Sequence, residues 1–274
     1  MINRSMSQAA VTMGQLQSKM DVIGHNLSNV NTHGYKSKTS SFSSLLYQQM
    51  DNLSHYEGEA NRLTHDGVRL GTGAKLGITN VDLSQGSLQN TGRALDVALL
   101  ENNHLFGLQV HTENGMDIQY TRSGNFYLNQ MDDGSMILTN SDGYPVMGID
   151  GNEVRIENDF SDISIDKNGR VVVTRGEGQS VEAQLNVVEA VRPRTLESVG
   201  NNRFRLPDGV AANEVITDVV PQDIQLQSET LEASNVNISN QMTDMLMAQR
   251  AYQFNAKSIS TSDQMMGLVN QLRS

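Results

Sequence analysis

The sequence contains no cysteine and no tryptophan, and only 5% of its 274 residues are aromatic. The absence of cysteine excludes a disulfide framework and every metal site built on thiolates. Aromatic side chains usually supply much of a protein core, so this chain has little material for one thick core. These absences favour an elongated molecule that buries part of its surface against neighbouring molecules.

Basic residues are also scarce, with 20 Lys and Arg against 31 Asp and Glu and a net charge of -11. A nucleic-acid partner requires clustered Lys and Arg to contact phosphates, so the charge argues against one. No apolar run is long enough to span a membrane, and the first residues lack the apolar stretch and cleavage site of a signal peptide. We therefore expect no membrane insertion and, if the chain leaves the cytosol, export without a cleaved signal peptide.

Proline is confined to positions 145, 193, 207 and 221, so both ends lack the strongest helix breaker. At the N-terminal end, apolar residues recur at alternating steps of four and three, the 3.5-residue repeat of a coiled-coil helix. This N-terminal stripe consists of Ile2, Met6, Ala9, Met13, Leu16, Met20, Ile23, Leu27 and Val30. It predicts a helix roughly 43 Å long that ends near residues 31–34, with Gly34 in the left-handed conformation after the last turn.

The C-terminal end carries a similar but less apolar repeat, because Gln249 and Asp263 occupy two of its positions. This C-terminal stripe consists of Ile238, Met242, Met245, Tyr252, Ala256, Ile259, Met266 and Val269. Ser234 or Asn235 is the predicted N-cap of the second helix, because both side chains can accept a hydrogen bond from its first turn.

Between the two ends, short alternating runs are separated by turn dipeptides of the hairpin kind. These dipeptides are Asp66-Gly67, Asn114-Gly115, Asp133-Gly134, Asp142-Gly143, Asp150-Gly151, Asn168-Gly169 and Asp208-Gly209. Strand-like runs lie beside them, such as residues 124–128 and 170–174. Residues 37–70 are polar and contain glycine, with a short helical start at Phe42, Leu45 and Leu46, and look like a connector.

The pattern predicts an α+β fold in which paired, coiled-coil-type terminal helices flank a mostly antiparallel β body. The expected division is an N-terminal helix of a core domain at 1–36, a connector at 37–70, a β-rich body at 71–230 inserted as an outer domain, and the C-terminal helix of the core domain at 231–274.

The N-terminal stripe must be covered either by the other terminal helix or by neighbouring subunits. Three features favour assembly: the stripe is rich in Met and Ala, which make adaptable contacts; Gly14 and Gly24 each weaken the helix by about 1 kcal/mol; and residues 26–32 are poor helix formers. A helix of this kind is marginal alone and folds on binding. The Asn-rich helix end then either frays or has its amides satisfied between subunits.

No catalytic, cofactor or metal site is predicted. The six histidines show no metal-ligand spacing. Residues 164–169 resemble part of a calcium loop, but Arg175 stands where a bidentate Glu is required, so a hairpin turn is expected. Paired carboxylates such as Asp132-Asp133 are common in so acidic a chain, and no nucleophile or phosphate-binding motif occurs.

Four motifs of the flagellar rod and hook protein family have similar counterparts here, two of them in two parts. Residues 20–36 are similar to its N-terminal signature, an Asn-rich helix end followed by Thr-x-Gly-aromatic-Lys. Residues 83–92 and 94–99 are similar to its core β segment, and residues 120–126 match its Tyr-Thr-Arg-x-Gly-x-Phe. Residues 231–237 and 245–257 resemble the start and body of its C-terminal helix.

The sequence departs from the family pattern at two places. Residues 100–106 replace the usual Gly-x-Gly-Phe-Phe, and Ser228-Glu229 replaces a usual Gln-Gly. These departures leave the subtype open, either a proximal- or distal-rod-like subunit, or a hook or rod-to-hook adaptor subunit.

The resemblance implies a structural subunit, not an enzyme, that needs no cofactor, polymerises helically through its terminal helices and transmits torque from motor to hook. Implied partners are other copies, neighbouring rod and hook proteins and the flagellar type III export apparatus, with a location in the basal body outside the cytoplasmic membrane. Other classes to weigh are a coiled-coil surface binding module and a cell-wall hydrolase. The predicted subunit-interface residues are Ile2, Met6, Met13, Leu16, Met20, Ile23, Asn26, Leu27, Asn29, Val30, Asn31, Ile238, Met242, Met245, Gln249, Arg250, Tyr252, Asn255 and Ile259.

Overall fold

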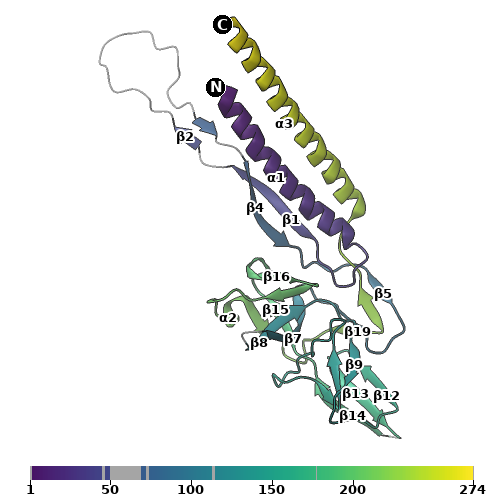
Figure 1. The fold of residues 1–274 in the computed structure, drawn as a ribbon. Helices are drawn as coiled ribbons and strands as arrows, with labels where there is room; N and C mark the ends of the chain where they lie inside the picture. The colour runs from purple at the N-terminus through teal and green to yellow at the C-terminus, as the bar shows by residue number, and fades with distance from the viewer. Residues whose placement is uncertain are drawn as a thin grey trace. The chain divides into compact units, whose positions relative to one another are not determined.

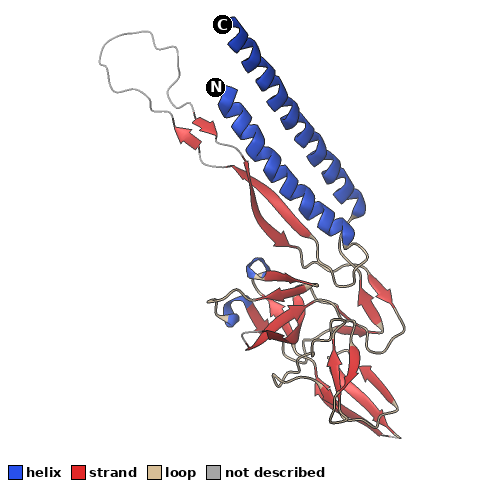
Figure 2. Cartoon of the chain, in the orientation of Figure 1, coloured by secondary structure: helices blue, strands red, loops and turns tan. Residues whose placement is uncertain are grey.

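The computed structural model describes residues 2–44, 47–49, 69–71, 74–112, 115–176 and 178–273. The chain divides into two compact units. Unit 1 comprises residues 1–25, 38–80 and 238–274, and unit 2 comprises residues 26–37 and 81–237. Figure 2 shows a long helix at each end of the chain and strands between them, the predicted α+β fold. None of the helices in the described ranges is apolar and long enough to cross a membrane.

Unit 1 contains the two terminal helices, α1 (Ile2–Ser28) and α3 (Ile238–Arg273). They pack together, as predicted, and run antiparallel, because the two chain ends lie at the same end of the pair (Figure 1). With 36 residues, α3 is about 54 Å long at 1.5 Å per residue.

The predicted end of the first helix was three residues too late. Helix α1 ends at Ser28, and the backbone N–H groups of Asn29 and Val30 donate to the carbonyl oxygens of Asn26 and Leu27 at 3.2 and 3.4 Å. These bonds to the third preceding residue tighten and finish the last turn. Gly34 has the predicted left-handed conformation, with φ of +69°, but it lies in the turn beyond the helix.

The predicted N-cap of the second helix was wrong, because α3 begins only at Ile238. Ser234 Oγ accepts a hydrogen bond from the N–H of Val236 at 3.3 Å, in the extended segment before the helix. Asn235 Nδ2 donates to the carbonyl oxygens of Asp82 and Ser84, so its side chain joins two chain segments and is directed away from the helix start.

The predicted helical start was wrong at Phe42, because residues Lys38–Ser44 form strand β1, and its other two residues, Leu45 and Leu46, lie outside the described residues. Strand β1 pairs with β4 (Ala74–Val81), and Thr39 Oγ1 donates to the carbonyl of Asn80. The Lys19 ammonium of α1 lies 5.3 Å from the centre of the Phe42 ring, a cation–π contact. A second short pair in this unit joins β2 (Tyr47–Gln49) and β3 (Arg69–Gly71) antiparallel.

Unit 2 is built from antiparallel sheets. The largest has the order β16-β17-β8-β7-β15-β18, formed by β7 (His104–Thr112), β8 (Gly115–Thr121), β15 (Val187–Ala190), β16 (Glu197–Gly200), β17 (Arg203–Arg205) and β18 (Ile216–Asp218). Two three-stranded sheets consist of β9 (Tyr127–Gln130), β10 (Met136–Thr139) and β11 (Arg155–Ile156), and of β12 (Asp162–Ile165), β13 (Arg170–Arg175) and β14 (Gly178–Gln184). Two short helices, η1 (Pro193–Thr195) and α2 (Ala212–Val215), lie in the connections.

Two further strand pairs bring the end of the unit back to its beginning. Strand β19 (Leu226–Ser228) pairs with β6 (Val97–Leu99), and β20 (Thr230–Glu232) pairs with β5 (Leu88–Asn90). The C-terminal segment of unit 2 therefore completes sheets that the earlier segments start.

The turn dipeptides form turns with left-handed glycines at five described positions, although the turn at 208–209 leads from β17 to α2 and is not a hairpin. The glycines of the dipeptides at 133–134, 142–143, 150–151, 168–169 and 208–209 all have φ between +76° and +85°. Only glycine reaches this conformation without steric cost, which is why these dipeptides were informative. The Asp66-Gly67 and Asn114 positions lie outside the described residues.

Two apolar clusters form the core of unit 2. The larger includes Phe106 and Phe126, which are fully buried and meet edge to face, with ring centres 5.1 Å apart at 80°. The smaller surrounds Leu105, Tyr120 and Phe204 of the six-stranded sheet. Phe126 itself precedes β9, so the predicted run at 124–128 is only partly strand.

Candidate functional site

The N-terminal stripe is covered within the chain. Ala9, Leu16 and Ile23, spaced seven residues apart on α1, are buried, and Met6, Met13, Met20 and Leu27 between them are half-buried. This alternation is the burial pattern of a heptad helix packed along one side. Nothing is described for the side chain of Ile2.

The C-terminal stripe combines residues from two sides of α3. Met245, Tyr252, Asn255 and Ile259 are half-buried, in line with buried Ala248. The other predicted interface residues of this helix are exposed, namely Ile238, Met242, Gln249 and Arg250. The covered side of α3 therefore carries a heptad repeat that includes the polar residue Asn255.

The opposite side of α3 exposes many large apolar side chains. The exposed face of α3, as we call it, consists of Ile238, Met242, Leu246, Met247, Phe254, Met265, Leu268, Val269 and Leu272. Phe254 is 75% exposed and Leu272 is 89% exposed. At 100° per residue, Met242, Leu246, Phe254, Leu268 and Leu272 lie about 120° or more around the helix from Ala248. Met247 and Met265 lie about 100° from it, and Ile238 and Val269, at about 80° and 60°, flank the covered side. Apolar surface of this extent usually marks an interaction site.

The Asn-rich end of α1 is partly satisfied within the chain. Asn26 is buried, and its Oδ1 accepts a hydrogen bond from the hydroxyl of Tyr35 at 2.9 Å. Burial raises the pKa of Tyr35 to about 12, so this hydroxyl keeps its proton at neutral pH. Asn29 and Val30 are half-buried, and Asn31 is exposed.

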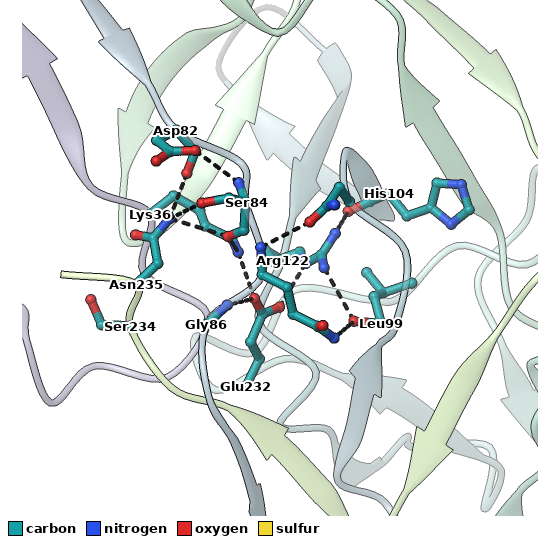
Figure 3. A network of polar contacts seen from close by, with 12 residues as sticks. Lys36, Asp82, Ser84, Gly86, Leu99, His104, Arg122, Glu232, Ser234 and Asn235 are labelled. Atoms are coloured by element: carbon teal, nitrogen blue, oxygen red, sulfur yellow. Dashed lines mark hydrogen bonds and ion pairs between the residues drawn. The ribbon is translucent and has the colours of Figure 1, made fainter. Parts of the chain in front are cut away.

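A buried ion cluster, formed by Lys36, Arg122 and Glu232, lies in unit 2 (Figure 3). The Lys36 ammonium is 2.6 Å from Glu232 Oε1, and Arg122 Nε is 2.7 Å from Glu232 Oε2. The side chains of Lys36, Arg122 and Glu232 are 1%, 0% and 2% exposed. Burial lowers the pKa of Lys36, the Arg122 guanidinium adds to that effect, and Glu232 opposes it.

The Arg122 and Lys36 side chains also donate hydrogen bonds to backbone carbonyl oxygens. Arg122 Nη1 donates to the carbonyl oxygen of His104 at 2.7 Å, and Nη2 to that of Leu99 at 3.1 Å. Lys36 Nζ also donates to the carbonyl oxygen of Ser84 at 2.6 Å. Every nitrogen of the Arg122 guanidinium therefore has a protein partner, and the cluster holds chain segments together.

Two glycines allow the backbone to approach this cluster. The N–H of Gly86 donates to Glu232 Oε1 at 2.7 Å, and a Cβ on Gly86 would lie 2.0 Å from the carbonyl oxygen of Ala233. A Cβ on Gly34 would lie 2.6 Å from Cα of Ser123. These contacts explain why glycine stands at both positions of the motifs.

The segments that carry the family resemblance converge on the cluster. Lys36 ends the N-terminal motif, Arg122 lies in the motif at 120–126, and Glu232 lies in the motif at 231–237. Sequence reasoning did not select these three residues as site residues. The available indication was that the motifs at 120–126 and 231–237 each contain a single charged residue.

The calcium-loop candidate at residues 164–169 has a structural role. Residues 164–169 include the turn between β12 and β13, where the N–H of Gly169 donates to the carbonyl oxygen of Asp166 at 2.9 Å. This agrees with the hairpin expected there. Among the residues that the structure describes, no three His, Asp or Glu side chains are grouped to hold a metal ion.

The described residues form an α+β fold with packed terminal helices, in which the three charges of the buried ion cluster join chain segments that are far apart in the sequence. Sequence comparison identifies the family. Residues 6–36 match the family described as "Flagella basal body rod protein", residues 106–173 match "Flagellar hook protein FlgE/F/G D1 domain", and residues 227–272 match "Flagellar basal body rod FlgEFG protein C-terminal".

Full-length relatives agree with these matches. The chain is 41% identical to the flagellar hook-basal body complex protein FlhP of Bacillus subtilis (strain 168), over 98% of this chain and 99% of that protein. It is 33% identical to the flagellar basal-body rod protein FlgG of the same organism, with the same coverage. FlgG of Buchnera aphidicola subsp. Acyrthosiphon pisum (strain APS) is 34% identical over 93% of this chain and 94% of that protein. The chain therefore belongs to the flagellar basal-body rod and hook protein family, and it is a non-enzymatic structural protein of the flagellar basal body.

Proposed function

We propose that this chain polymerises helically through its terminal helices and, as a rod subunit, transmits torque from the motor to the hook. Its proposed partners are other copies of itself, neighbouring rod and hook proteins and the flagellar export apparatus, outside the cytoplasmic membrane. The observation that carries the proposal is the exposed face of α3. A long helix already covered on one side, and apolar on the other, has a surface suited to a second helix.

The burial of individual residues divides the predicted interface. Ile238, Met242, Gln249, Arg250 and Asn31 are exposed in the single chain, and we propose that they meet neighbouring subunits. Leu16, Ile23 and Asn26 are buried in the single chain, so we assign them to holding α1 in place. The half-buried residues of both helices can serve either purpose, since part of each side chain is still accessible.

We propose that different segments of the sequence have different roles in the assembly. Residues 1–36 and 231–274 would form the core domain that polymerises, residues 37–70 the connector, and residues 71–230 the outer β-rich body. The heterologous contact needed for a filament does not close on itself, so one face must meet a different surface of the next copy.

A second candidate is a hook subunit or a rod-to-hook adaptor. The 41% identity to a protein named for the hook-basal body complex, against 33% for a rod protein of the same organism, favours considering it. Labelling this chain in isolated hook–basal bodies would distinguish the two candidates, since a rod subunit is found inside the basal body and an adaptor at its junction with the hook.

Assembly through α3 is tested by placing charges on its exposed face. The double variant Met242→Glu, Leu246→Glu should fold, because both side chains are more than half exposed, but should fail to enter hook–basal bodies and should abolish motility. Val181→Glu in β14 is the matched control, since that valine is also 57% exposed but lies in unit 2. Normal assembly and motility of the double variant would rule out this face as the interface.

A further inference from the structure

The buried ion cluster contains two cations and one carboxylate. Lys36 precedes the body, Arg122 follows β8 in the middle of the chain, and Glu232 ends β20 near the C-terminal side of unit 2. Among the residues that the structure describes, Glu232 is the only carboxylate in ion-pair contact with either cation. The neutralising charge therefore comes from β20, near the C-terminal end of unit 2.

Neither cation can reach water in the folded unit. Their side chains are almost fully buried, and the Arg122 guanidinium is fixed to the carbonyl oxygens of Leu99 and His104 on β6 and β7. Removing one partner of a buried ion pair is strongly destabilising, because the other charge stays desolvated without compensation. Here, the absence of Glu232 would leave two such charges.

Glu232 is held in place by its backbone as well. Its carbonyl oxygen accepts a hydrogen bond from the N–H of Gly34 at 2.8 Å, and its strand β20 pairs with β5. The following N–H, of Ala233, donates to the carbonyl oxygen of Ser87 at 2.8 Å. The charge can therefore reach the cluster only when the whole C-terminal segment of unit 2 has docked.

We propose that the buried ion cluster makes the folding of unit 2 conditional on its C-terminal segment. Before residues 226–235 dock, closing the unit would bury Lys36 and Arg122 together without a counterion, so the six-stranded sheet stays open. Folding of unit 2 is thereby delayed until its own C-terminal segment is present, and a chain that lacks this segment does not form a finished unit 2.

The test compares amide hydrogen exchange in two full-length variants. Glu232→Gln keeps the shape of the side chain and removes its charge, and Glu229→Gln makes the same change at an exposed position three residues away. In Glu232→Gln, protection in β7, β8 and β15 should fall together with that in β19 and β20, by roughly 10²- to 10³-fold. Glu229→Gln should leave protection unchanged. If only residues 226–237 lose protection while β7 and β8 keep theirs, the proposal is wrong.

A second variant shows whether Glu232→Gln loses protection because of unpaired charge or because of lost hydrogen bonds. It also keeps the test informative if Glu232→Gln does not fold. Lys36→Met combined with Glu232→Gln removes one of the two unpaired cations. Under the proposal, the double variant recovers part of the protection that Glu232→Gln loses. If the double variant is no better protected than Glu232→Gln, or worse, the cluster acts through its hydrogen bonds and the proposal fails.

Discussion

Replacing Gly86 by alanine should destabilise unit 2 through one backbone contact. The new Cβ would lie 2.0 Å from the carbonyl oxygen of Ala233, and Cβ atoms essentially never approach another atom closer than 3.0 Å. The two segments must therefore move apart by about 1 Å, which is beyond what bond-angle adjustment can supply. The partner is backbone and cannot turn aside as a flexible side chain would.

The magnitude follows from the hydrogen bonds that this movement breaks. The N–H of Gly86 is 2.7 Å from Glu232 Oε1, so a shift of about 1 Å takes it beyond hydrogen-bond distance. A bond to a charged group contributes about 1.5–3 kcal/mol, and the neighbouring bond from Ala233 to Ser87 about 1 kcal/mol more. Gly86→Ala should therefore lower the free energy of unfolding by about 3 kcal/mol.

The assay is urea unfolding of the purified chain followed by circular dichroism, with Gly24→Ala as the control. Gly24 lies inside α1 with no atom within 4 Å of its added Cβ, so alanine there should stabilise by about 1 kcal/mol through helix propensity. The two substitutions are chemically identical and have opposite expected signs. An unchanged urea midpoint for Gly86→Ala would refute the contact described for it.

Two other changes test the core and the pH dependence of unit 2. Phe126→Ala should lower the free energy of unfolding by about 3–5 kcal/mol in the same urea assay, because it removes a fully buried ring packed on Phe106. Burial lowers the pKa of His104 below its ordinary value of 6.5, Glu189 opposes this effect and Arg122 adds a smaller lowering, so the unfolded chain binds this proton first as the pH falls. The free energy of unfolding should therefore fall below about pH 6.5, with this group contributing up to about 1.4 kcal/mol per pH unit. Between pH 7.5 and 5.5, His104→Gln should lose less unfolding free energy than the wild type. Equal losses in the two proteins would contradict the assignment of this effect to His104.

Local patterns predicted the fold class well because they depend on neighbouring residues. The heptad spacing of α1 was reproduced as buried Ala9, Leu16 and Ile23, and the Asp-Gly and Asn-Gly dipeptides became turns with left-handed glycines. Element ends were less predictable. Asn235 has the chemistry of an N-cap, but its amide donates to the carbonyl oxygens of Asp82 and Ser84 and so ties its own segment to theirs. No local pattern in the sequence contains such a contact.

The buried ion cluster could not be predicted from the sequence for the same reason. Lys36 and Glu232 are 196 residues apart in the sequence, and nothing in the spacing of charges indicates which of the many acidic residues neutralises which cation. The motifs placed these residues in segments of interest. Long-range contacts bring them together, namely the pairing of β20 with β5 and the hydrogen bond from the N–H of Gly34 to the carbonyl oxygen of Glu232. Long-range pairing of single charges needs the topology first.

Helix α3 shows why one apolar repeat can conceal two surfaces. Its predicted stripe joined half-buried Met245 and Ile259 to exposed Ile238 and Met242, because apolar residues occur on both sides of the helix and a chain of steps of three and four can pass from one side to the other. Burial separates the two sides: one is covered in the single chain, and the other exposes residues as large as Phe254. A helix that only packed within its own chain would gain nothing from an apolar outer side, which adds a tendency to aggregate. The division of α3 into a covered side and an exposed apolar side is therefore the strongest structural argument that this helix meets a second partner.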